Sequence, residues 1–462
     1  MALGEVERKP ETKDPSPRGK GNLLLSGDDL KRGIWPRSVS FWMVAVYVAL
    51  FIIRPWEQMF PWLGSIYFEK IYAILMIVVV FLSGGKQVKY NLQTLSVLFF
   101  LFAITVSAFF ALKISLAWDP LYAYLTLVIF YFVLYITIKT PYELVFMVLC
   151  YIATMAVYLA KSQWEFFIHG QHRYDMGVIR LIGIEETFGG PNSLAMSIVV
   201  SLPMFFFLWS IRKELSNGWP KFWKKWVPRL LIFYFLLAIS SIVLTNSRSG
   251  MLSFVFFVIL VTFRGKGFGK KFLYLIVGIV FLALIWFVLP EEQKGRFATI
   301  WDPSTGPESA EVSAEGRVEG YKAGIKMFER FPISGVGIGN FISYRESYVD
   351  GVSLNAHNLA GQLLGETGII GAGAFIFMVF IIAVNCYRVI WQGKRNVSDS
   401  NIVLFSGIGF ACRDALILLA FEGTFGHNLL RYNWLWLAAF SGLALQFCRI
   451  KIQNRIDPND YR

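Results

Sequence analysis

Charged residues are scarce in this sequence. Asp, Glu, Lys and Arg make up only 16% of its 462 residues, whereas 56% are hydrophobic and 17% are aromatic. A soluble domain carries about 25% charged residues, so this composition excludes a soluble globular protein. Many apolar stretches instead reach the roughly 17–25 residues that a membrane-spanning helix needs. Ten-residue segments of alternating hydrophobicity are absent, which excludes an outer-membrane barrel, and we predict an all-α, polytopic membrane protein.

Sequence motifs for metal and nucleophile chemistry are also missing. The four cysteines lie in or beside apolar segments without CxxC spacing, so we interpret them as packing residues rather than as a disulfide or metal set. The sequence has no HExxH motif, no paired His and Cys, no Ser/His/Asp set and no outward DxD or DxxD pair. We therefore expect neither metal-assisted chemistry nor a bound cofactor.

The first residues of the chain are polar, contain Pro and Gly, and lack the apolar core of a signal peptide. We expect 1–37 to be a disordered cytoplasmic tail. Nine spans should follow within 38–289, then an extracytoplasmic loop at 290–356, three spans within 357–448 and a cytoplasmic tail at 449–462. The expected spans, about twelve in all, have these approximate bounds: 39–54, 66–83, 92–112, 119–138, 142–161, 188–211, 229–246, 249–264, 271–289, 357–387, 402–421 and 433–448.

The distribution of Lys and Arg orients these spans. One alternate set of connections, which includes both termini, holds 28 of these residues, whereas the other set holds 15. Because Lys and Arg favour the cytoplasmic side, we place both termini inside and the segments 162–187, 245–250 and 290–355 outside. The net charge of +13 is then mostly positive-inside charge and does not indicate nucleic-acid binding. The basic stretch at 212–229 is expected to contact anionic membrane lipids.

The hexapeptide TNSRSG (245–250) interrupts the apolar run at 230–263. The run is too long for one span, so we expect a two-helix hairpin that turns at this hexapeptide. Arg248 should then lie at the outer interface and face a polar cavity, because an arginine at the bilayer centre costs roughly 2.5–3.5 kcal/mol. Ser247 or Asn246 can cap the second helix. The simpler alternative is an arginine that snorkels at a helix end.

The extracytoplasmic loop should contain a helix. In SAEGRVEGYKAGIKMFERFP (313–332), apolar residues recur at helical spacing. We expect this helix to cover about 314–331, with Ser313 as its N-cap and Pro332 as its stop. The following GVGIGNF (335–341) predicts a tight glycine-rich return rather than a nucleotide loop, because it follows no strand.

His357 is expected to begin a long span on the outward side, in the sequence NAHNLAGQLLGETGIIGAG. Glycines follow it on the same helical face, which lets another backbone approach closely. Glu366 should lie near the opposite side of the helix, so we do not pair it with His357. A neutral histidine here can deprotonate a hydroxyl, because its ordinary pKa is about 6.5. The alternative is an interfacial histidine that bonds a loop carbonyl.

Two further outward stretches carry polar residues. RLIGIEETFGGPNSLAM contains Arg180 and opens a span at Asn192. EGTFGHNLLRYNW carries His427 and Arg431, which form a weaker candidate. The planar fork of arginine suits phosphate oxygens, so the outward arginines predict an anionic headgroup as ligand. These arginines are Arg180, Arg248, Arg317, Arg330 and Arg345.

Four motifs occur in order on the outward side: GGPNSLA, SRSG, EGRVEGYKAGIKMFERFPISGVGIGNF and AHNLAGQLLGETGIIG. Over about 180–372 the chain resembles the O-antigen ligase/polymerase superfamily, which includes O-antigen ligases, polysaccharide polymerases and protein O-oligosaccharyltransferases. Its members often have SRGA or SRGG where this chain has Ser249-Gly250, which is a conservative departure. The resemblance implies a metal-independent, inverting glycosyltransferase of the bacterial cytoplasmic membrane, whose donor is a glycan on a polyprenyl diphosphate.

Carried over to this sequence, the resemblance implies that Arg248 and Arg317 hold the donor diphosphate and that His357 activates the acceptor hydroxyl. Further substrate contacts are expected from Arg180, Asn192, Ser247, Tyr321 and Asn358. The acceptor hydroxyl stays open between a lipid, a glycan and a protein, so a protein O-oligosaccharyltransferase is one alternative. Another is a transporter or flippase of a lipid-linked or anionic solute, although the two halves of the chain show no convincing repeat.

Overall fold

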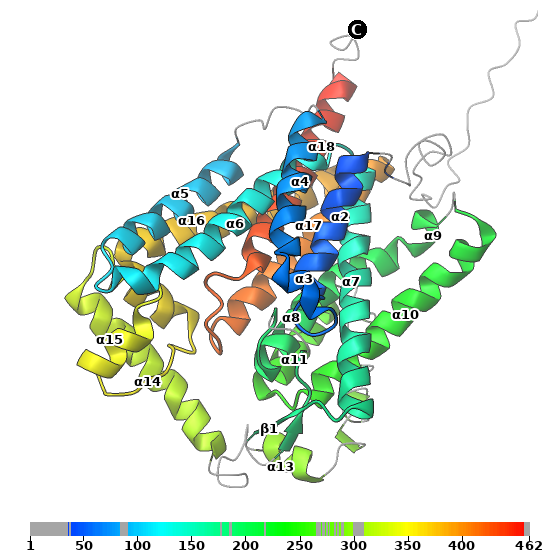
Figure 1. The fold of residues 1–462 in the computed structure, drawn as a ribbon. Helices are drawn as coiled ribbons and strands as arrows, with labels where there is room; N and C mark the ends of the chain where they lie inside the picture. Colours follow the sequence, from blue (N-terminus) through cyan, green and yellow to red (C-terminus); the bar gives the residue numbers. More distant parts are fainter. Residues whose placement is uncertain are drawn as a thin grey trace, which may run out of the picture.

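The structure is a computed structural model, and it describes residues 36, 38–83, 91–175, 178–183, 187–216, 219–264, 269, 273, 276, 278–280, 283, 286, 287, 291–298 and 309–456. Most of these residues are helical (Figure 1). The strands β1 (Arg173–Asp175) and β2 (Val178–Arg180) pair antiparallel in a small two-stranded sheet. The prediction of an all-α membrane protein is confirmed.

Eight helices in the described part of the chain are long and apolar enough to cross a membrane. They are α5 (Leu92–Phe109), α6 (Ile114–Thr137), α7 (Pro141–Ile168), α8 (Pro191–Ser210), α10 (Lys221–Leu244), α16 (Leu359–Arg395), α17 (Ser400–Glu422) and α18 (Tyr432–Ile456). The remaining helices are α2 (Val39–Ile53), α3 (Pro61–Ser65), α4 (Phe68–Leu82), α9 (Arg212–Leu215), α11 (Arg248–Arg264), α13 (Glu291–Ala298), α14 (Ser309–Arg330) and α15 (Phe341–Tyr348). The total of about twelve spans stays a prediction.

Some expected boundaries fall outside the described residues or shift. Almost all of the expected tail at 1–37 and much of the expected span at 271–289 lie outside them. The last helix, α18, continues to Ile456, past the expected boundary at 448. The four cysteines are free thiols, three of them buried among the helices, which confirms their interpretation as packing residues.

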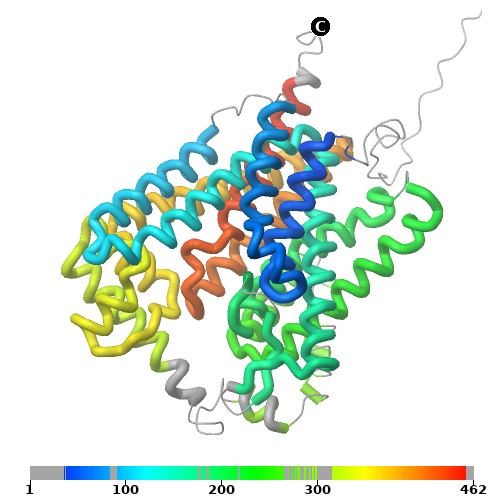
Figure 2. Tube along the Cα trace, viewed as in Figure 1, coloured from blue at the N-terminus to red at the C-terminus, as the bar shows by residue number. Residues whose placement is uncertain are grey.

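The helices pack into one bundle around α16. This helix contacts α5, α17 and α18, while α17 contacts α8 and α11, and α7 contacts α2, α8 and α10. Buried apolar side chains from these helices form one core. The elements α13, α14, α15 and β1 gather at the end of the bundle that lies away from the C-terminus (Figures 1 and 2). The outward motifs of the sequence therefore share one end of the molecule.

The apolar run at 230–263 forms the predicted hairpin of α10 and α11. The chain reverses at Asn246, whose φ of 49° lies in the left-handed region that Asn tolerates better than most residues. Ser247 caps α11, because its Oγ accepts a hydrogen bond from the N–H of Gly250 at 3.1 Å. Asn246 instead donates its amide N–H to the Ile179 carbonyl of β2 at 2.8 Å. Hydrogen bonds to α11 and to β2 thus hold this turn, and Arg248 follows it as the first residue of α11.

The glycine-rich return at 335–341 binds the backbone of α16 beside a break in this helix. Gly368 has a non-helical φ of 59° and ψ of −158° inside this helix. The carbonyls of Gly365 and Glu366 accept hydrogen bonds from the backbone N–H groups of Val336 and Gly337 at 2.9 and 3.1 Å. Because unpaired backbone groups within a membrane cost several kcal/mol each, the return allows a long apolar helix to kink without leaving them unsatisfied.

The Glu366 side chain points towards this glycine-rich return. It is 3% exposed, and its carboxylate accepts hydrogen bonds from the backbone N–H of Gly339 at 3.0 Å and from the Gln362 amide at 3.2 Å. The expectation that Glu366 faces away from His357 is therefore confirmed.

The loop helix α14 begins earlier than expected. It starts at Ser309, so Ser313 lies inside the helix and its predicted role as N-cap is wrong. The segment between these two serines holds Ala310 and Glu311, which favour helix, and no Gly or Pro, so nothing there stops the helix. The helix ends at Arg330, shortly before Pro332 as expected.

Glycines bring α14 against the start of α16. A Cβ on Gly324 would overlap the backbone of Gly361, and a Cβ on Gly320 would overlap the backbone of Ala356. A Cβ on Gly365 would lie 3.2 Å from the Cα of Gly324. The predicted glycine face of α16 thus receives a second backbone, and this contact sets the distance between α14 and His357.

Candidate functional site

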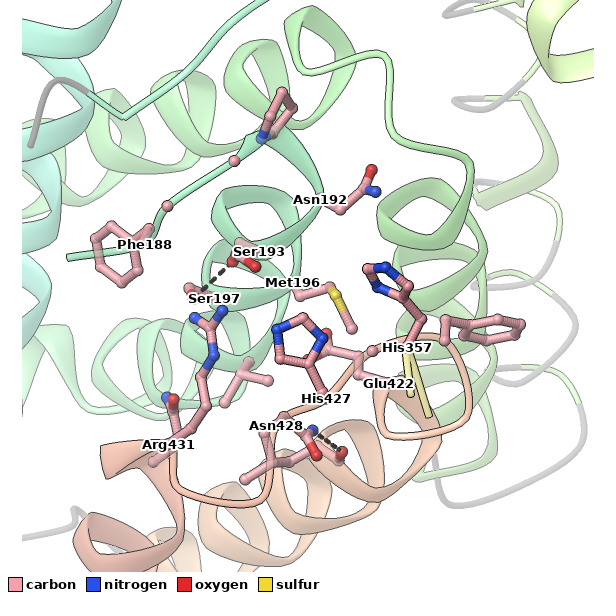
Figure 3. A pocket seen from close by; sticks show the side chains of 18 of the residues that line it. Phe188, Asn192, Ser193, Met196, Ser197, His357, Glu422, His427, Asn428 and Arg431 are labelled. Carbon is pink, nitrogen blue, oxygen red and sulfur yellow. Dashed lines mark hydrogen bonds between the residues drawn. The ribbon is translucent and has the colours of Figure 1, made fainter. Parts of the chain in front are cut away.

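The described residues enclose a cavity of about 990 Å³ at the end of the bundle where the outward motifs gather. Its walls come from the sheet and the start of α8, from α14, from the residues before α16, and from the α17–α18 connection. Figure 3 shows side chains from the start of α8, from the residue before α16 and from the α17–α18 connection pointing into one space. Segments that are far apart in the sequence therefore build a single site.

His357 and His427 meet across this cavity (Figure 3). Their ring centroids are 5.3 Å apart with an interplanar angle of 62°. The backbone holds the pair, because the N–H of Leu359 donates to the Gly423 carbonyl at 2.7 Å. Asn358 caps α16 through its side-chain oxygen and donates its amide N–H to the Thr424 carbonyl at 3.3 Å. The start of α16 is thus bound to the connection that carries His427.

Both histidines are shifted towards the neutral form. Burial lowers the pKa of His357, and the charges of Arg317 and Arg345 lower it further. Burial, His357 and Arg431 lower the pKa of His427 to about 4. His427 is among the residues that line the cavity. At neutral pH each ring therefore has a nitrogen that can accept a proton.

Arg317 projects from α14 into the same cavity. Its Nε donates to the Phe425 carbonyl at 3.3 Å, on the connection that also carries His427. Burial lowers its pKa, and the nearby positive charge of Arg248 lowers it further. Arg248 is half-buried at the start of α11 and acts electrostatically on Arg317, although it is not among the residues that line the cavity. Two like charges that influence each other favour an anion near them.

Arg180 organises the turn that precedes Arg248. Its guanidinium is buried and donates to the Thr245 carbonyl at 2.9 Å and to Asn192 Oδ1 at 2.7 Å. Ser247 donates its hydroxyl to the same Asn192 oxygen at 2.8 Å. Arg180 and Asn192 line the cavity, whereas Ser247 lies behind them. These three residues therefore come together as one network that joins β2, α8 and the α10–α11 turn.

Tyr321 and Asn358 do not line the cavity. Tyr321 is 42% exposed on α14, and the Asn358 side chain makes the capping contacts described above.

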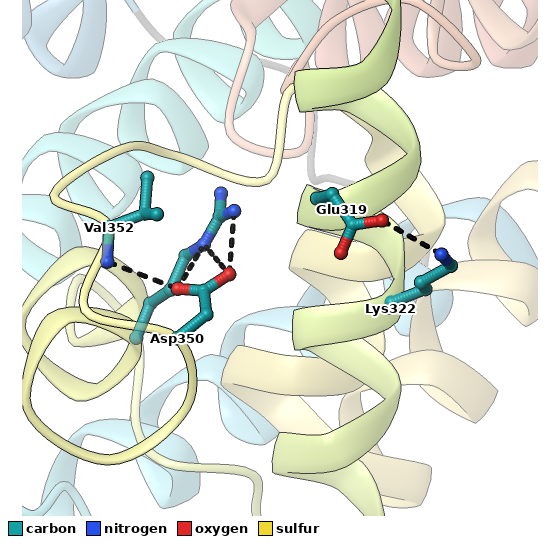
Figure 4. Close-up of polar contacts among 5 residues, drawn as sticks. Glu319, Lys322, Asp350 and Val352 are labelled. Atoms are coloured by element: carbon teal, nitrogen blue, oxygen red, sulfur yellow. Dashed lines mark hydrogen bonds and ion pairs between the residues drawn. The ribbon is translucent and has the colours of Figure 1, made fainter.

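The expectation that Arg345 offers its guanidinium fork to a phosphate is wrong. This side chain is only 2% exposed, and it binds Asp350 through Nε at 3.0 Å and Nη2 at 2.8 Å (Figure 4). Arg330 is exposed at the far end of α14 and also lies outside the cavity.

Other lining residues received little or no weight in the sequence. His427 and Arg431 are central rather than weak candidates, and Arg173 and Glu422 also line the cavity. Among the lining residues that the structure describes, Glu422 is the one carboxylate against four arginines, so this part of the wall is cationic. No group of three or more His, Cys, Asp and Glu within the described residues is arranged to hold a metal ion.

Residues 233–376 match the family model described as O-antigen ligase. The chain carries an O-antigen ligase domain. The match covers the second half of α10, α11 with Arg248, the loop helix with Arg317, and His357 with the start of α16. The predicted resemblance to the O-antigen ligase/polymerase superfamily is confirmed over these residues, and it indicates a glycosyltransferase-like function of ligase or polymerase type. No curated protein matches the chain.

The O-antigen ligase domain does not contain the whole cavity. The strand that carries Arg180, the start of α8 with Asn192 and the α17–α18 connection with His427 all lie outside the matched residues. A signal for the last of these was present in the sequence as a His and an Arg four residues apart, His427 and Arg431, on an outward connection. Only the folded bundle brings them against the ligase domain.

Proposed function

We propose that this protein transfers an oligo- or polysaccharide from a polyprenyl-diphosphate donor to an acceptor hydroxyl in the cavity. One observation carries the proposal: Arg317 and His357 of the O-antigen ligase domain line one cavity with two further arginines from the sheet, Arg173 and Arg180. The site faces the extracytoplasmic side of a bacterial cytoplasmic membrane, with both termini inside, as the distribution of Lys and Arg favours.

The donor diphosphate binds beside Arg248 and Arg317. These two guanidinium groups repel each other in the free protein, and a diphosphate relieves this repulsion while accepting bidentate hydrogen bonds. In the reaction the bond between the sugar C1 and the diphosphate oxygen breaks, and both electrons leave with the diphosphate. The arginines stabilise the charge that develops there, so the step requires no metal ion.

The acceptor hydroxyl approaches C1 from the opposite face, and its oxygen forms the new bond with inversion at C1. His357 takes the hydroxyl proton. Its lowered pKa keeps the ring neutral before the step, which a general base requires. His427 lies next to His357 and orients the hydroxyl or the His357 ring. The products are the glycosylated acceptor, the polyprenyl diphosphate and a protonated histidine that returns its proton to water.

The size and the position of the cavity suit such substrates. Its volume of about 990 Å³ is at the upper end of the range of about 300–1,000 Å³ of small-molecule sites. The α14 helix covers it from one side and touches the connection that holds His427 through the contact between Arg317 and Phe425. We propose that α14 closes over the donor and excludes water from the developing charge.

A transfer assay tests this function directly. Purified protein in lipid vesicles is given a synthetic polyprenyl-diphosphate glycan with a fluorescent label, together with a lipid-linked saccharide, a second lipid-linked repeat or a serine peptide. We expect the label to move to one of these acceptors, and to move equally well with excess EDTA.

The acceptor that receives the label separates a ligase, a polymerase and a protein glycosyltransferase. Movement of the donor across the bilayer without transfer to any acceptor would instead support a flippase. Transfer that stops with EDTA and returns with magnesium or manganese would contradict the metal-independent mechanism.

A further inference from the structure

A second polar pocket lies at the other end of the bundle. It has a volume of about 230 Å³ and lies between the start of α5, the second half of α16 and the second half of α18. An adjoining hollow of about 260 Å³ shares Arg388, Leu445 and Arg449 with it. Because a helix rises about 1.5 Å per residue, the part of α16 between the break at Gly368 and Arg388 alone spans roughly 30 Å. This pocket is therefore separate from the cavity.

Arg388 and Arg449 stand where the two hollows join. Both side chains are exposed, one on α16 and the other on α18. Neither forms a hydrogen bond or an ion pair within the residues that the structure describes. Their neighbour Arg395 differs, because its guanidinium stacks on Trp391 at 3.7 Å. The two pocket arginines thus retain free donors that converge from two helices on one space.

The inner wall of the pocket is polar, although it lies between apolar helices. Asn385 donates its amide N–H to Gln93 Oε1 at 2.9 Å across the contact of α16 and α5. Gln446 adds an amide oxygen that is buried and has no hydrogen-bond partner within the described residues. A buried unpaired polar atom costs about 1–3 kcal/mol in proteins. The pocket wall therefore contains an amide oxygen that has no partner within the described residues, in addition to the two arginines.

We propose that this pocket binds the phosphate group of an anionic phospholipid. Arg388 and Arg449 donate to the phosphate oxygens, for which the guanidinium fork is suited. Ile381 and Leu445 provide an apolar wall for the glycerol and the start of the acyl chains. Basic pockets between membrane helices bind lipid headgroups in this way. The proposal does not depend on the reaction in the cavity.

A lipid fits this place better than a soluble phosphate. Trp391 lines the outer hollow and is 38% exposed, and tryptophan favours the membrane–water interface at headgroup level. The distribution of Lys and Arg assigns this end of the bundle to the cytoplasmic side, where anionic lipids attract basic residues. A phosphate that is held at the interface by its own acyl chains is present at a high local concentration.

Native mass spectrometry of the full-length protein in a neutral detergent tests the proposal. The protein is titrated with phosphatidylglycerol, with phosphatidylcholine of the same acyl chains, or with inorganic phosphate. We expect tight binding of phosphatidylglycerol alone. The double variant R388Q/R449Q should bind it about 30-fold more weakly, since each basic residue contributes about fivefold. R388K/R449K should recover part of the affinity.

The matched control is K394Q/K451Q. It removes the same charge from the same end of α16 and α18, at exposed positions that do not line either hollow. We expect its affinity for phosphatidylglycerol to equal that of the wild-type protein. An equal loss in both double variants would mean that general surface charge binds the lipid. Equal binding of phosphatidylcholine, or binding of inorganic phosphate with the same affinity, would also contradict the proposal.

Discussion

The two ends of the helix bundle hold arginine in different ways. At the cavity end, Arg180 and Arg317 are held by backbone carbonyls, so their guanidinium groups have fixed positions. At the other end, Arg388 and Arg449 are exposed and make no such bonds within the described residues. Fixed charges serve a reaction, because they are in place before charge develops. Exposed charges serve reversible binding of a ligand that brings its own counter-charge.

The largest effect expected among the arginine variants separates a cavity arginine from a surface arginine of the same helix. Arg317→Ala removes a fixed cation beside the donor, whereas Arg330→Ala removes an exposed cation of α14 that lies outside the cavity. We expect Arg317→Ala to lower the transfer rate by about 10²-fold or more. Arg330→Ala should retain the wild-type rate. Equal losses in the vesicle assay would mean that α14 attracts the donor by its net charge and that the position of Arg317 is unimportant.

A smaller effect concerns the geometry of the arginine fork. Arg248→Lys keeps the charge at the start of α11 but loses the planar pair of donors. We expect its transfer rate to lie between those of the wild-type protein and Arg248→Ala. The rates of the three proteins at saturating donor provide the measurement. Full activity of Arg248→Lys would show that Arg248 acts as a charge alone.

The third prediction compares a buried and an exposed ion pair beside the cavity (Figure 4). Asp350→Asn weakens the partner of Arg345, which is 2% exposed, and should lower the free energy of unfolding by about 1–3 kcal/mol. Glu319→Gln removes the exposed pair with Lys322 and should lower it by less than about 1 kcal/mol. Thermal unfolding in detergent measures both. Equal melting temperatures of the two variants would show that Arg345 needs no partner.

The Asp350 contribution should also depend on pH. The hydrogen bonds from Arg345 lower the pKa of Asp350 in the folded protein. The stability that this carboxylate provides is therefore complete above the pKa of an unfolded Asp, about 3.9, and is lost as the pH falls through the lower folded value. The difference in melting temperature between the wild-type protein and Asp350→Asn should be constant from pH 5 to 8.

The smallest effect is a shift of the pH profile of transfer. His357 must be neutral to act as a base, so the rate should fall as the pH drops through its pKa. Burial and Arg317 place this pKa below the ordinary value of about 6.5. In Arg317→Gln the residual activity should therefore lose its acid limb at a higher pH than the wild-type activity. An acid limb at the same pH in both proteins would show that a group other than His357 titrates there.

The sequence was sufficient for the features that depend on local pattern. The turn before Arg248, the end of α14 before Pro332 and the orientation of Glu366 all follow from hydrophobic spacing, glycine and proline, and the structure confirms them, whereas several helices are longer than expected. The outward placement of the motifs, which rests on counting Lys and Arg, stays a prediction. The predicted start of α14 was wrong, because the segment after Ser309 carries no signal that stops a helix.

The composition of the site was harder to predict, because it depends on packing between distant segments. Arg345 and Arg317 both lie in the outward loop and look alike in sequence, yet one is bound to Asp350 and the other faces the cavity. His427 received little weight because its partner, His357, is 70 residues away in the numbering and meets it only when α16 and α17 pack. Sequence pattern does not encode such contacts directly.

The most direct test of the central claim compares His357→Ala with His169→Ala in the same vesicles. His169 is an exposed histidine that pairs with Glu165 and does not line the cavity. With bound donor and transferred glycan measured together, His357→Ala should retain the donor and lose transfer by about 10²–10⁴-fold, while His169→Ala matches the wild-type protein. Transfer at the wild-type rate by His357→Ala would contradict the account.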